Sequence, residues 1–469
     1  MQRIAIIGGG AAGSAVVAQF LQNAADYDYG SGCALTWIVG ERAPGRGVAY
    51  ETVDAQHLLN VRAANMGLFA DQPGDFLDYA ATRGIAASGG QFLPRSIYGD
   101  YLEATLERLL RTTRRRVSLA ARSTEAVAIR PLADHSFSIH TRSGDDLRAD
   151  GIVLALGALP AATLPGVTAQ ARASGAYASD PWAWPSLPRA PEHVLVIGTG
   201  LTGVDALLSA AARWPKARLT AVSRRGRLPA LHSEQPLAAY AEQAQLVALL
   251  RRDADLGHWL RSVRAAATAP GADWRAVLDA VRAEIPRCWQ ALDTAQRARF
   301  LRHLRPVWEV VRHRMPLQTA ARIRALQDSG RLRILAARVR GIDGGDPLLL
   351  AQVQPRGSGA QPYSVAADFV IQATGLESDA QTTTHTLVRQ LVDSGVAQPD
   401  ALGLGLAAHA DGRLLRADGS TWQNVYALGT LLRGSVWECT GMPEIRTLAQ
   451  TIVRDLPLAA QPAPLVAVA

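Results

Sequence analysis

Residues 3–13 read RIAIIGGGAAG, and residues 194–203 read VLVIGTGLTG. In both stretches an apolar, β-branched run leads into Gly-x-Gly-x-x-Gly, and an alanine- and leucine-rich segment follows. Such a strand, tight turn and helix lets the backbone approach a pyrophosphate at the helix N-terminus. The residues assigned to this contact are Gly8, Gly10, Gly13, Gly198, Gly200, Thr202 and Gly203. One such pattern is weak evidence, but two in this context predict two nucleotides, one held permanently and one exchanged.

The length and charge of the chain limit its class. At 469 residues it is too long for one compact core, so two or three domains are expected. The formal net charge of +8 would suit a nucleic-acid partner, but Lys216 is the only lysine among 49 basic residues. This arginine skew, beside abundant alanine, indicates a GC-rich genome, and no nucleic-acid-binding motif accompanies it. We therefore expect small-molecule partners and no nucleic acid.

Cysteine usage is sparse. Cys33, Cys288 and Cys439 are odd in number and widely spaced, so they form no disulfide framework, zinc-site spacing or Cys-x-x-Cys pair. This usage fits a reduced, cytoplasmic compartment, and we expect no metal. No stretch is long and apolar enough to span a bilayer, so no membrane partner is expected.

Two segments of the chain, one after each glycine pattern, resemble each other. Residues 116–122 precede a run of strands that ends at 150–157, and residues 333–338 precede one that ends at 368–375. The similarity indicates the duplication of one nucleotide-binding architecture.

These patterns predict an α/β fold with two Rossmann-like dinucleotide-binding domains, the second inserted into the first. The first domain would comprise residues 1–180 and 331–469, and the second residues 190–330. A helical pattern between about 236 and 328 predicts a helical insert in the second domain. Helices are expected over residues 237–250, 257–267, 274–283, 294–305 and 319–327.

The insert carries a dense basic run from Arg297 to Arg314. It includes Arg302, His303, Arg305, Arg312, His313 and Arg314. The simpler interpretation is a solvated helix face. The alternative is that some of these arginines line a pocket for an anionic substrate or a nucleotide phosphate.

The residues after the second strand of each domain differ in charge. Glu41 follows the strand 34–39 and could accept hydrogen bonds from a ribose, although it could also be a plain surface residue. The second domain offers Ser223, Arg224 and Arg225 instead. Arginines bind a 2′-phosphate bidentately, which favours NADPH, although arginine can also stack on the adenine of NADH.

Two nucleotides in one chain usually mean that a bound flavin takes hydride from a nicotinamide. A disulfide reductase would need a redox cysteine pair, which the sequence lacks. The reduced flavin would then pass its electrons to dioxygen or to an organic acceptor. Monooxygenation is the commoner outcome for such an architecture.

Further motifs give the sequence a family resemblance. They are GRGVAY at 45–50, LNV at 59–61 with Met66, FLPR at 92–95, YGDYL at 98–102, DPW at 180–182, SRRG at 223–226, GSVWE at 434–438 and PEIR at 443–446. Over nearly its whole length the chain resembles the stand-alone FAD/NAD(P)-binding family of bacterial flavoproteins that includes the FAD-dependent urate hydroxylases. More distantly, it is similar to flavin N-hydroxylases with two nucleotide domains.

The resemblance implies cofactor contacts outside the glycine patterns. Arg46 and Gly47 would contact the FAD phosphates, while Asn60 and Met66 would lie in a loop that approaches the isoalloxazine. Val127 would meet the adenine through its backbone. The glycines expected at the nucleotide crevices and the ribityl chain are Gly157, Gly375 and Gly429.

The resemblance also suggests catalytic candidates. Arg95 and Tyr98 offer a cation and a phenol near the flavin, and a turn-stabilising role is an equal alternative for each. Trp437, Glu438 and Arg446 are candidates for the substrate side. For Trp437 the alternative is a core aromatic, and for Glu438 and Arg446 it is a mutual salt bridge.

The predicted function is an FAD-dependent monooxygenase that consumes NADPH or NADH and hydroxylates a small polar or anionic substrate with dioxygen. Within the resembled family, urate is the best substrate guess, which would give 5-hydroxyisourate. The alternatives are a flavin N-hydroxylase of an amino acid or amine, and a non-catalytic flavin redox or electron-transfer protein.

Overall fold

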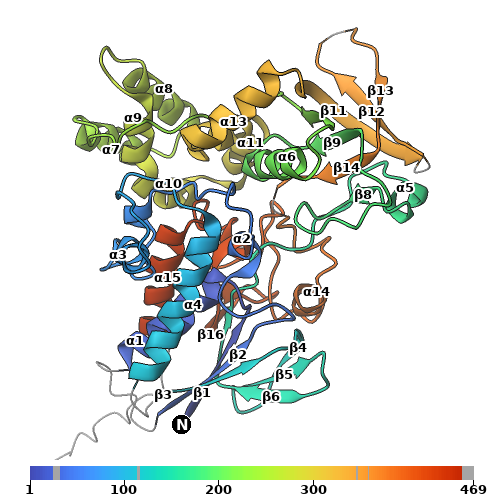
Figure 1. Ribbon diagram of the computed structural model, residues 1–469. Coiled ribbons are helices and arrows are strands. Elements are labelled where there is room, and N and C mark those ends of the chain that lie inside the picture. The colour runs from blue at the N-terminus through green and yellow to red at the C-terminus, as the bar shows by residue number, and fades with distance from the viewer. Residues whose placement is uncertain (25–31, 114–116, 345–346, 358, 376, 457–469) are drawn as a thin grey trace, which may run out of the picture.

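The computed structural model describes residues 1–24, 32–113, 117–344, 347–357, 359–375 and 377–456 (Figure 1). Its strands form two large, mainly parallel sheets and one small antiparallel sheet. In Figure 1 the first large sheet lies at the bottom, the second at the upper right, and a group of helices at the upper left. The α/β class that the sequence predicts is confirmed.

The first sheet consists of β1 (Gln2–Ile7), β2 (Cys33–Ile38), β3 (Val117–Arg122), β7 (Gly151–Leu154), β15 (Arg413–Leu415) and β16 (Thr421–Ala427). Its order is β15-β16-β7-β1-β2-β3, and all neighbours are parallel except β15 and β16. The central strands are apolar because both faces of the sheet are covered.

Helices cover one face of the first sheet, and a small sheet covers the other. The helical face carries α1 (Ala11–Asn23), α4 (Arg95–Thr112) and α15 (Met442–Asp455), joined by α2 (Gly47–Tyr50), η1 (Ala63–Asn65) and α3 (Asp75–Thr82). The opposite face carries β4 (Ala126–Pro131), β5 (Phe137–Thr141), β6 (Asp146–Ala149), α14 (Thr386–Asp393) and η3 (Gly429–Leu432).

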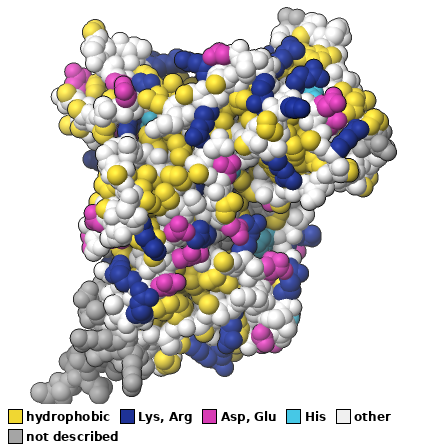
Figure 2. All heavy atoms as spheres, in the orientation of Figure 1, with side chains coloured by type: hydrophobic (Ala, Val, Ile, Leu, Met, Phe, Trp, Pro, Cys, Tyr) yellow, Lys and Arg dark blue, Asp and Glu magenta, His cyan; other side chains and the backbone are white. Residues whose placement is uncertain are grey.

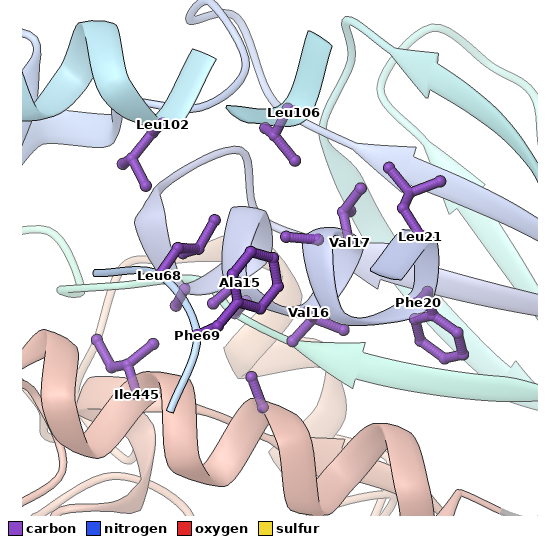
Figure 3. Close-up of a cluster of buried hydrophobic side chains, with 14 of the residues drawn as sticks. Ala15, Val16, Val17, Phe20, Leu21, Leu68, Phe69, Leu102, Leu106 and Ile445 are labelled. Atoms are coloured by element: carbon purple, nitrogen blue, oxygen red, sulfur yellow. The ribbon is translucent and has the colours of Figure 1, made fainter. Parts of the chain in front are cut away.

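Close packing holds α1 between α4 and α15. Figure 3 shows Val16 and Phe20 of α1 in one apolar cluster with Leu102 and Leu106 of α4 and Ile445 of α15. Val16 and Phe20 are fully buried. Side chains more than 300 residues apart in sequence therefore fix the helix that follows the first glycine turn.

The second sheet consists of β8 (Tyr177–Ala178), β9 (His193–Ile197), β10 (Arg218–Ser223), β11 (Leu332–Gly344), β12 (Leu349–Pro355), β13 (Tyr363–Ala367) and β14 (Phe369–Gln372). Its order is β13-β12-β11-β10-β9-β14-β8. On one face lie α6 (Leu201–Arg213) and α13 (Leu317–Asp328), and on the other lies α5 (Ala169–Ala173).

The two sheets share one plan. The parallel order β16-β7-β1-β2-β3 of the first matches β8-β14-β9-β10-β11 of the second. Each also has a three-stranded antiparallel part, β4-β5-β6 in the first and β11-β12-β13 in the second. The paired segments of the sequence therefore occupy equivalent strands, and the second unit lies within the chain of the first.

The predicted domain boundary needs a correction. Residues 332–372 were assigned to the first domain, but β11 pairs with β10 and β14 pairs with β9, which places them in the second sheet. The boundary at residue 330 is therefore too early, and the second unit runs to the end of β14. The reason is that the strands after the insert, β11 to β14, complete the second sheet. Only afterwards does the chain return to the first sheet, with β15 and β16.

The helical insert is confirmed as helical, with different bounds. It contains α7 (Gln243–Arg252), α8 (Leu256–Ala267), α9 (Trp274–Val281), η2 (Arg282–Glu284), α10 (Ile285–Ala291), α11 (Thr294–His303) and α12 (Arg305–Arg312). The helix expected from 237 begins only at Gln243, and α10 and α12 were not expected. Residues 319–327 belong to α13, which packs on α6 in the second unit instead of in the insert.

The surface adds two observations. No helix among the described residues is long and apolar enough to cross a membrane. On the face shown in Figure 2, basic side chains are spread over the whole outline with acidic ones among them, and they form no single patch there. The basic side chains on that face are thus dispersed.

Candidate functional site

The first glycine turn joins β1 to α1 by close backbone contacts. Gly8 has a φ of +125°, and a Cβ there would lie 2.2 Å from the carbonyl oxygen of Ala155. A Cβ at Gly13 would lie 2.0 Å from the carbonyl oxygen of Gly8. Gly10 precedes the first residue of α1, and no described side chain caps that helix. The turn therefore presents free backbone N–H groups, which suit an anion.

A loop lies against this first turn. The Gly45 N–H donates to the carbonyl of Gly9 (2.8 Å), and the Ser14 hydroxyl donates to the carbonyl of Gly45 (3.1 Å). Gly47 has a φ of +60°, and a Cβ there would lie 2.8 Å from the Cα of Gly10. The loop is thus fixed next to the position where a pyrophosphate would lie.

Arg46, between these glycines, is already paired. Its guanidinium binds both carboxylate oxygens of Glu103 (2.7 Å each) and Asp100 (2.5 Å), both on α4. These carboxylates compete with any phosphate for its charge. This geometry favours a role for Arg46 in anchoring the loop to α4. It argues against the predicted contact of Arg46 with the FAD phosphates.

Two other residues of the first unit remain available for a nucleotide. Glu41 is exposed just after β2, and it has no hydrogen bond or ion pair with the described residues. In β4 the pairing with β5 shifts between Ala126 and Ala128, so Val127 is the residue of a bulge. A bulge leaves backbone groups out of the ladder, which suits the predicted contact of Val127 with an adenine.

The second glycine turn has the same geometry but is more open. Gly198 has a φ of +121°, and a Cβ there would lie 2.0 Å from the carbonyl oxygen of Ala373. A Cβ at Gly203 would lie 2.2 Å from the carbonyl oxygen of Gly198, whereas one at Gly200 would meet no described atom within 4 Å. Thr202 lies in the first turn of α6 and is half-buried. No loop equivalent to residues 45–47 lies against Gly200 in the described chain.

The end of β10 carries two available cations. The Thr199 hydroxyl donates to the Ser223 hydroxyl (2.7 Å), and the Gly226 N–H donates to the same Ser223 oxygen (3.1 Å). Arg224 is exposed and Arg225 half-buried, and neither forms an ion pair with any described residue. Unlike Arg46, these guanidiniums can bind a phosphate without losing a partner.

Three further glycines open the crevices at the strand ends. Gly157, Gly375 and Gly429 have φ values of +71°, +96° and +79°. A Cβ at any of them would meet no atom of the described residues within 4 Å. They follow β7, β14 and β16, at the carboxyl ends where nucleotides bind in such sheets.

The loop predicted to approach the isoalloxazine contains one buried and one part-exposed candidate. Met66 is 2% exposed and belongs to the core around α1. Asn60 is half-buried, and its backbone carbonyl accepts a hydrogen bond from Nε2 of His232 (3.1 Å). Asn60 therefore lies where the first unit meets the second.

Arg95 also joins the two units. Its guanidinium lies 2.7 Å from a carboxylate oxygen of Asp205 on α6; Asp205 is buried and Arg95 is half-buried. Beside it, His57 Nε2 lies 2.8 Å from the Ser209 hydroxyl, which donates to Asp54 (3.0 Å). The geometry favours an inter-unit ion pair for Arg95 over the predicted contact with the flavin. Asp205 and His57 were missed because their partners are distant in sequence.

Tyr98 is a core residue with an unusual hydroxyl. It is fully buried among Tyr50, Phe76 and Tyr101, with ring centroids 4.6–5.5 Å apart. Its hydroxyl has no hydrogen-bond partner among the described residues. Burial raises the pKa of Tyr98 well above its ordinary value, so the phenol stays protonated.

Trp437 and Glu438, two of the catalytic candidates, contact the helical insert. Trp437 is 5% exposed and packs against Trp289 and Phe300, so it is a core aromatic. Glu438 accepts hydrogen bonds from the Trp308 indole (3.0 Å) and from Arg312 (2.9 Å). The C-terminal segment is therefore attached to the insert by both apolar and charged contacts.

Arg446 does not pair with Glu438. It donates to the backbone carbonyls of Asn65 (3.2 Å) and Gly67 (2.7 Å). The mutual salt bridge considered from the sequence is therefore wrong. Arg446 lies on α15 against the loop around η1, whereas Glu438 precedes α15 and meets α12.

The basic run from Arg297 to Arg314 is solvated in one part and paired with acidic residues in another. Arg302 and His303 are exposed on α11. Arg312 is half-buried and pairs with Glu438, and Arg314 is buried and pairs with Asp279. The solvated-face interpretation holds for α11 only.

The cysteines are all described, free and buried. The Cys439 thiol donates to the carbonyl of Gly429 at 3.2 Å. Burial raises the pKa of Cys33 and of Cys439 to about 12 and that of Cys288 to about 11. These thiols are protonated and form no redox pair. The described residues also hold no cluster of potential metal ligands.

Comparisons with known proteins agree with this arrangement. A family model described as FAD-NAD(P)-binding matches residues 5–159, which include the first glycine turn, β2 and β7. A search of curated protein sequences found no match. The first unit thus carries the sequence features of an FAD-NAD(P)-binding domain.

Solved structures share the fold over almost the whole chain. One is the ornithine N-hydroxylase of Kutzneria sp. 744 with reduced FAD, NADP+ and L-ornithine, which is 14% identical with a TM-score of 0.65 and covers 97% of this chain and 98% of its own. Another is the L-lysine 6-monooxygenase of Pseudomonas syringae, which is 17% identical with a TM-score of 0.62 and the same coverage. The cadaverine monooxygenase of Erwinia amylovora, bound to FAD, is 13% identical with a TM-score of 0.63 and covers 97% of this chain and 94% of its own. This chain therefore has the fold of two-nucleotide flavoproteins.

Proposed function

We propose that the chain is an FAD-dependent monooxygenase that consumes NADPH and hydroxylates the nitrogen of a small amine. The observation that carries the proposal is the inequality of the two glycine turns. The first has a loop fixed against it, an acid in Glu41 that has no partner among the described residues, and a match to the FAD-NAD(P)-binding model. The second is open and adjoins two arginines that form no ion pair within the described chain. A resident FAD fits the first turn, and an exchanging NADPH fits the second.

The residues present would hold the nucleotides by their ordinary chemistry. The N-terminus of α1 would face the FAD pyrophosphate, Glu41 would accept from the ribose, and the Val127 backbone would meet the adenine. The N-terminus of α6 would face the pyrophosphate of NADPH, and Arg224 and Arg225 would bind its 2′-phosphate. The flavin, when bound, accepts two electrons and passes them to dioxygen.

The cysteines support oxygen as the acceptor. A disulfide relay needs a pair of thiols beside the flavin and a low thiol pKa. The three thiols here are separate, and burial raises their pKa values. The electrons therefore leave by another route.

The substrate assignment changes from the one based on family resemblance. Nothing in the comparisons supports urate, and the similar folds named above act on ornithine, lysine and cadaverine. The reaction we propose uses one amine, one dioxygen, one NADPH and one proton. It gives one hydroxylamine, one NADP+ and one water, so that NADPH supplies the two electrons that reduce the second oxygen atom.

The test uses the purified protein loaded with FAD. We expect NADPH to bleach the flavin in the absence of air. In air, an amine such as L-ornithine, L-lysine or cadaverine should accelerate NADPH oxidation without equivalent peroxide and should gain one oxygen atom by mass. A flavin that neither NADPH nor NADH reduces would refute the proposal. If urate were turned over and no amine were, the amine would be refuted as the substrate class and urate would replace it.

A further inference from the structure

Three arginines from separate segments gather around His232. Arg62 of the first unit donates to the Ser233 carbonyl at 2.8 Å. Arg275 of α9 donates to the Leu231 carbonyl at 2.8 Å, and Arg314 follows α12 beside the bridge between Leu231 and Met315. Burial, and after it the charges of these three guanidiniums, lower the pKa of His232 to about 4. His232 is therefore neutral at pH 7.

The charge of this cluster is incompletely balanced. Arg275 pairs with Asp273 at 3.3 Å, and Arg314 pairs with Asp279. Among the described residues, Arg62 forms no ion pair and hydrogen-bonds only to uncharged oxygen atoms, namely those of Gly90, Ser233 and Gln235. Three guanidiniums against two carboxylates leave one positive charge, which matches a monoanion.

Arg314 keeps a donor for such a ligand. Its side chain is 7% exposed, and its Nε is buried without a hydrogen-bond partner in the described chain. An unpaired buried donor on a charged group is costly, so such groups normally have a partner. The guanidinium presents its donors in a planar fork that matches a carboxylate.

The cluster lies between the two nucleotide units. Residues 60–62 belong to the segment that leaves the carboxyl end of β2, and residues 231–233 belong to the one that leaves the carboxyl end of β10. These segments meet where Nε2 of His232 donates to the carbonyl of Asn60. The cluster therefore lies where the first nucleotide unit meets the second.

We propose that Arg62, Arg275 and Arg314 form a subsite for the carboxylate of the substrate, which is therefore an amino acid and not a simple diamine. The inference rests on the proposed function and narrows its substrate class. The carboxylate would bind Nε of Arg314 and neutralise the excess charge. Loss of one charge-assisted hydrogen bond weakens binding about 10- to 100-fold.

The experiment compares amino acids with their decarboxylated counterparts. Thermal unfolding of the FAD-loaded protein is measured with L-ornithine, putrescine, L-lysine and cadaverine, and turnover is measured with the same four compounds. We expect the amino acids to raise the unfolding midpoint more than the diamines, with a lower KM. Equal effects of an amino acid and its diamine, or no shift with either amino acid, would overturn the subsite. The proposed function is judged separately by flavin reduction with NADPH.

Variants identify the residues. Arg314→Lys keeps the charge but removes Nε, so the KM for the amino acid should rise about 10- to 100-fold while that for the diamine stays constant. Arg62→Gln should act in the same direction, and Arg299→Lys on the exposed part of α11 serves as the matched control. If Arg314→Lys raised the KM for NADPH while that for the amino acid stayed constant, the cluster would be a phosphate site and the subsite would be refuted.

Discussion

The two glycine turns are alike in backbone and unlike in surroundings. Gly8 and Gly198 have φ values of +125° and +121°, and a Cβ at either would meet the carbonyl of the residue just after the neighbouring strand, β7 or β14. Among the described residues, only the first turn has a loop fixed against it, through Gly45, Gly47 and Ser14. The comparison shows that the glycine pattern specifies the fold of a nucleotide site, while the neighbouring loop and charges specify how that nucleotide is used.

The largest effect should come from filling one turn at a time. In Gly10→Val the side chain would project over the N-terminus of α1, and we expect protein without bound FAD. Gly200→Val should keep FAD and lose flavin reduction by NADPH, because a Cβ there meets no described atom and the fold can accept it. The measurements are the flavin absorbance per chain and the rate of flavin reduction, with circular dichroism to check folding. Stoichiometric FAD in Gly10→Val would contradict the assignment of the first turn as the FAD site.

The contact between the units should show the next largest effect. Asp205→Asn leaves the half-buried Arg95 guanidinium without its carboxylate, which costs about 3 kcal/mol, the lower limit for breaking a buried pair. Urea unfolding should show this loss, and NADPH should reduce the remaining folded flavoprotein more slowly at unchanged FAD content. Asp71→Asn, at an exposed position with no hydrogen bond or ion pair to any described residue, is the control. Equal stability of the two variants would mean that the pair does not join the units.

Coenzyme choice should depend on the arginines after β10. Reversing both charges with Arg224→Glu and Arg225→Glu removes the phosphate partners and should raise the KM for NADPH about 10- to 100-fold. The KM for NADH should change much less. Arg322→Glu together with Arg324→Glu, two exposed changes on α13, controls for net charge. Equal effects on both coenzymes would remove the NADPH preference.

A smaller effect should appear in the pH dependence of stability. The folded protein keeps His232 neutral down to pH about 4, whereas an unfolded histidine binds a proton near pH 6.5. The unfolded state therefore binds more protons between these values, and stability falls as the pH falls from 6.5 toward 4. The expected loss is roughly 2 kcal/mol for a part-exposed ring. His232→Asn can still donate to Asn60 and should lessen this slope, whereas an unchanged slope would exclude His232 as its source.

Local patterns in the sequence predicted the turns and most strands. The glycine spacing, the β-branched runs and the charges after β2 and β10 all lie within short segments, and the structure places them as expected. The partners of Arg46, Arg95 and Glu438 are contributed by α4, α6 and α12, more than 50 residues away in each case. Such contacts depend on how helices pack, which no local pattern records.

The boundary error has a similar cause. Residues 332–372 were separated from the second unit because the helical insert interrupts its sequence. The repeated segment at 333–338 was the signal that could have corrected this, since its counterpart at 116–122 stays with the first glycine turn. Strand pairing between β10 and β11 settles the assignment.

The most direct test of the unequal turns is nucleotide retention. The protein is saturated with FAD and NADP+, passed through a gel-filtration column, and analysed for both nucleotides after denaturation. We predict about one FAD per chain and almost no NADP+, with NADP+ binding again when it is added back. Retention of both nucleotides in equal amounts, or retention of NADP+ with loss of FAD, would contradict the account.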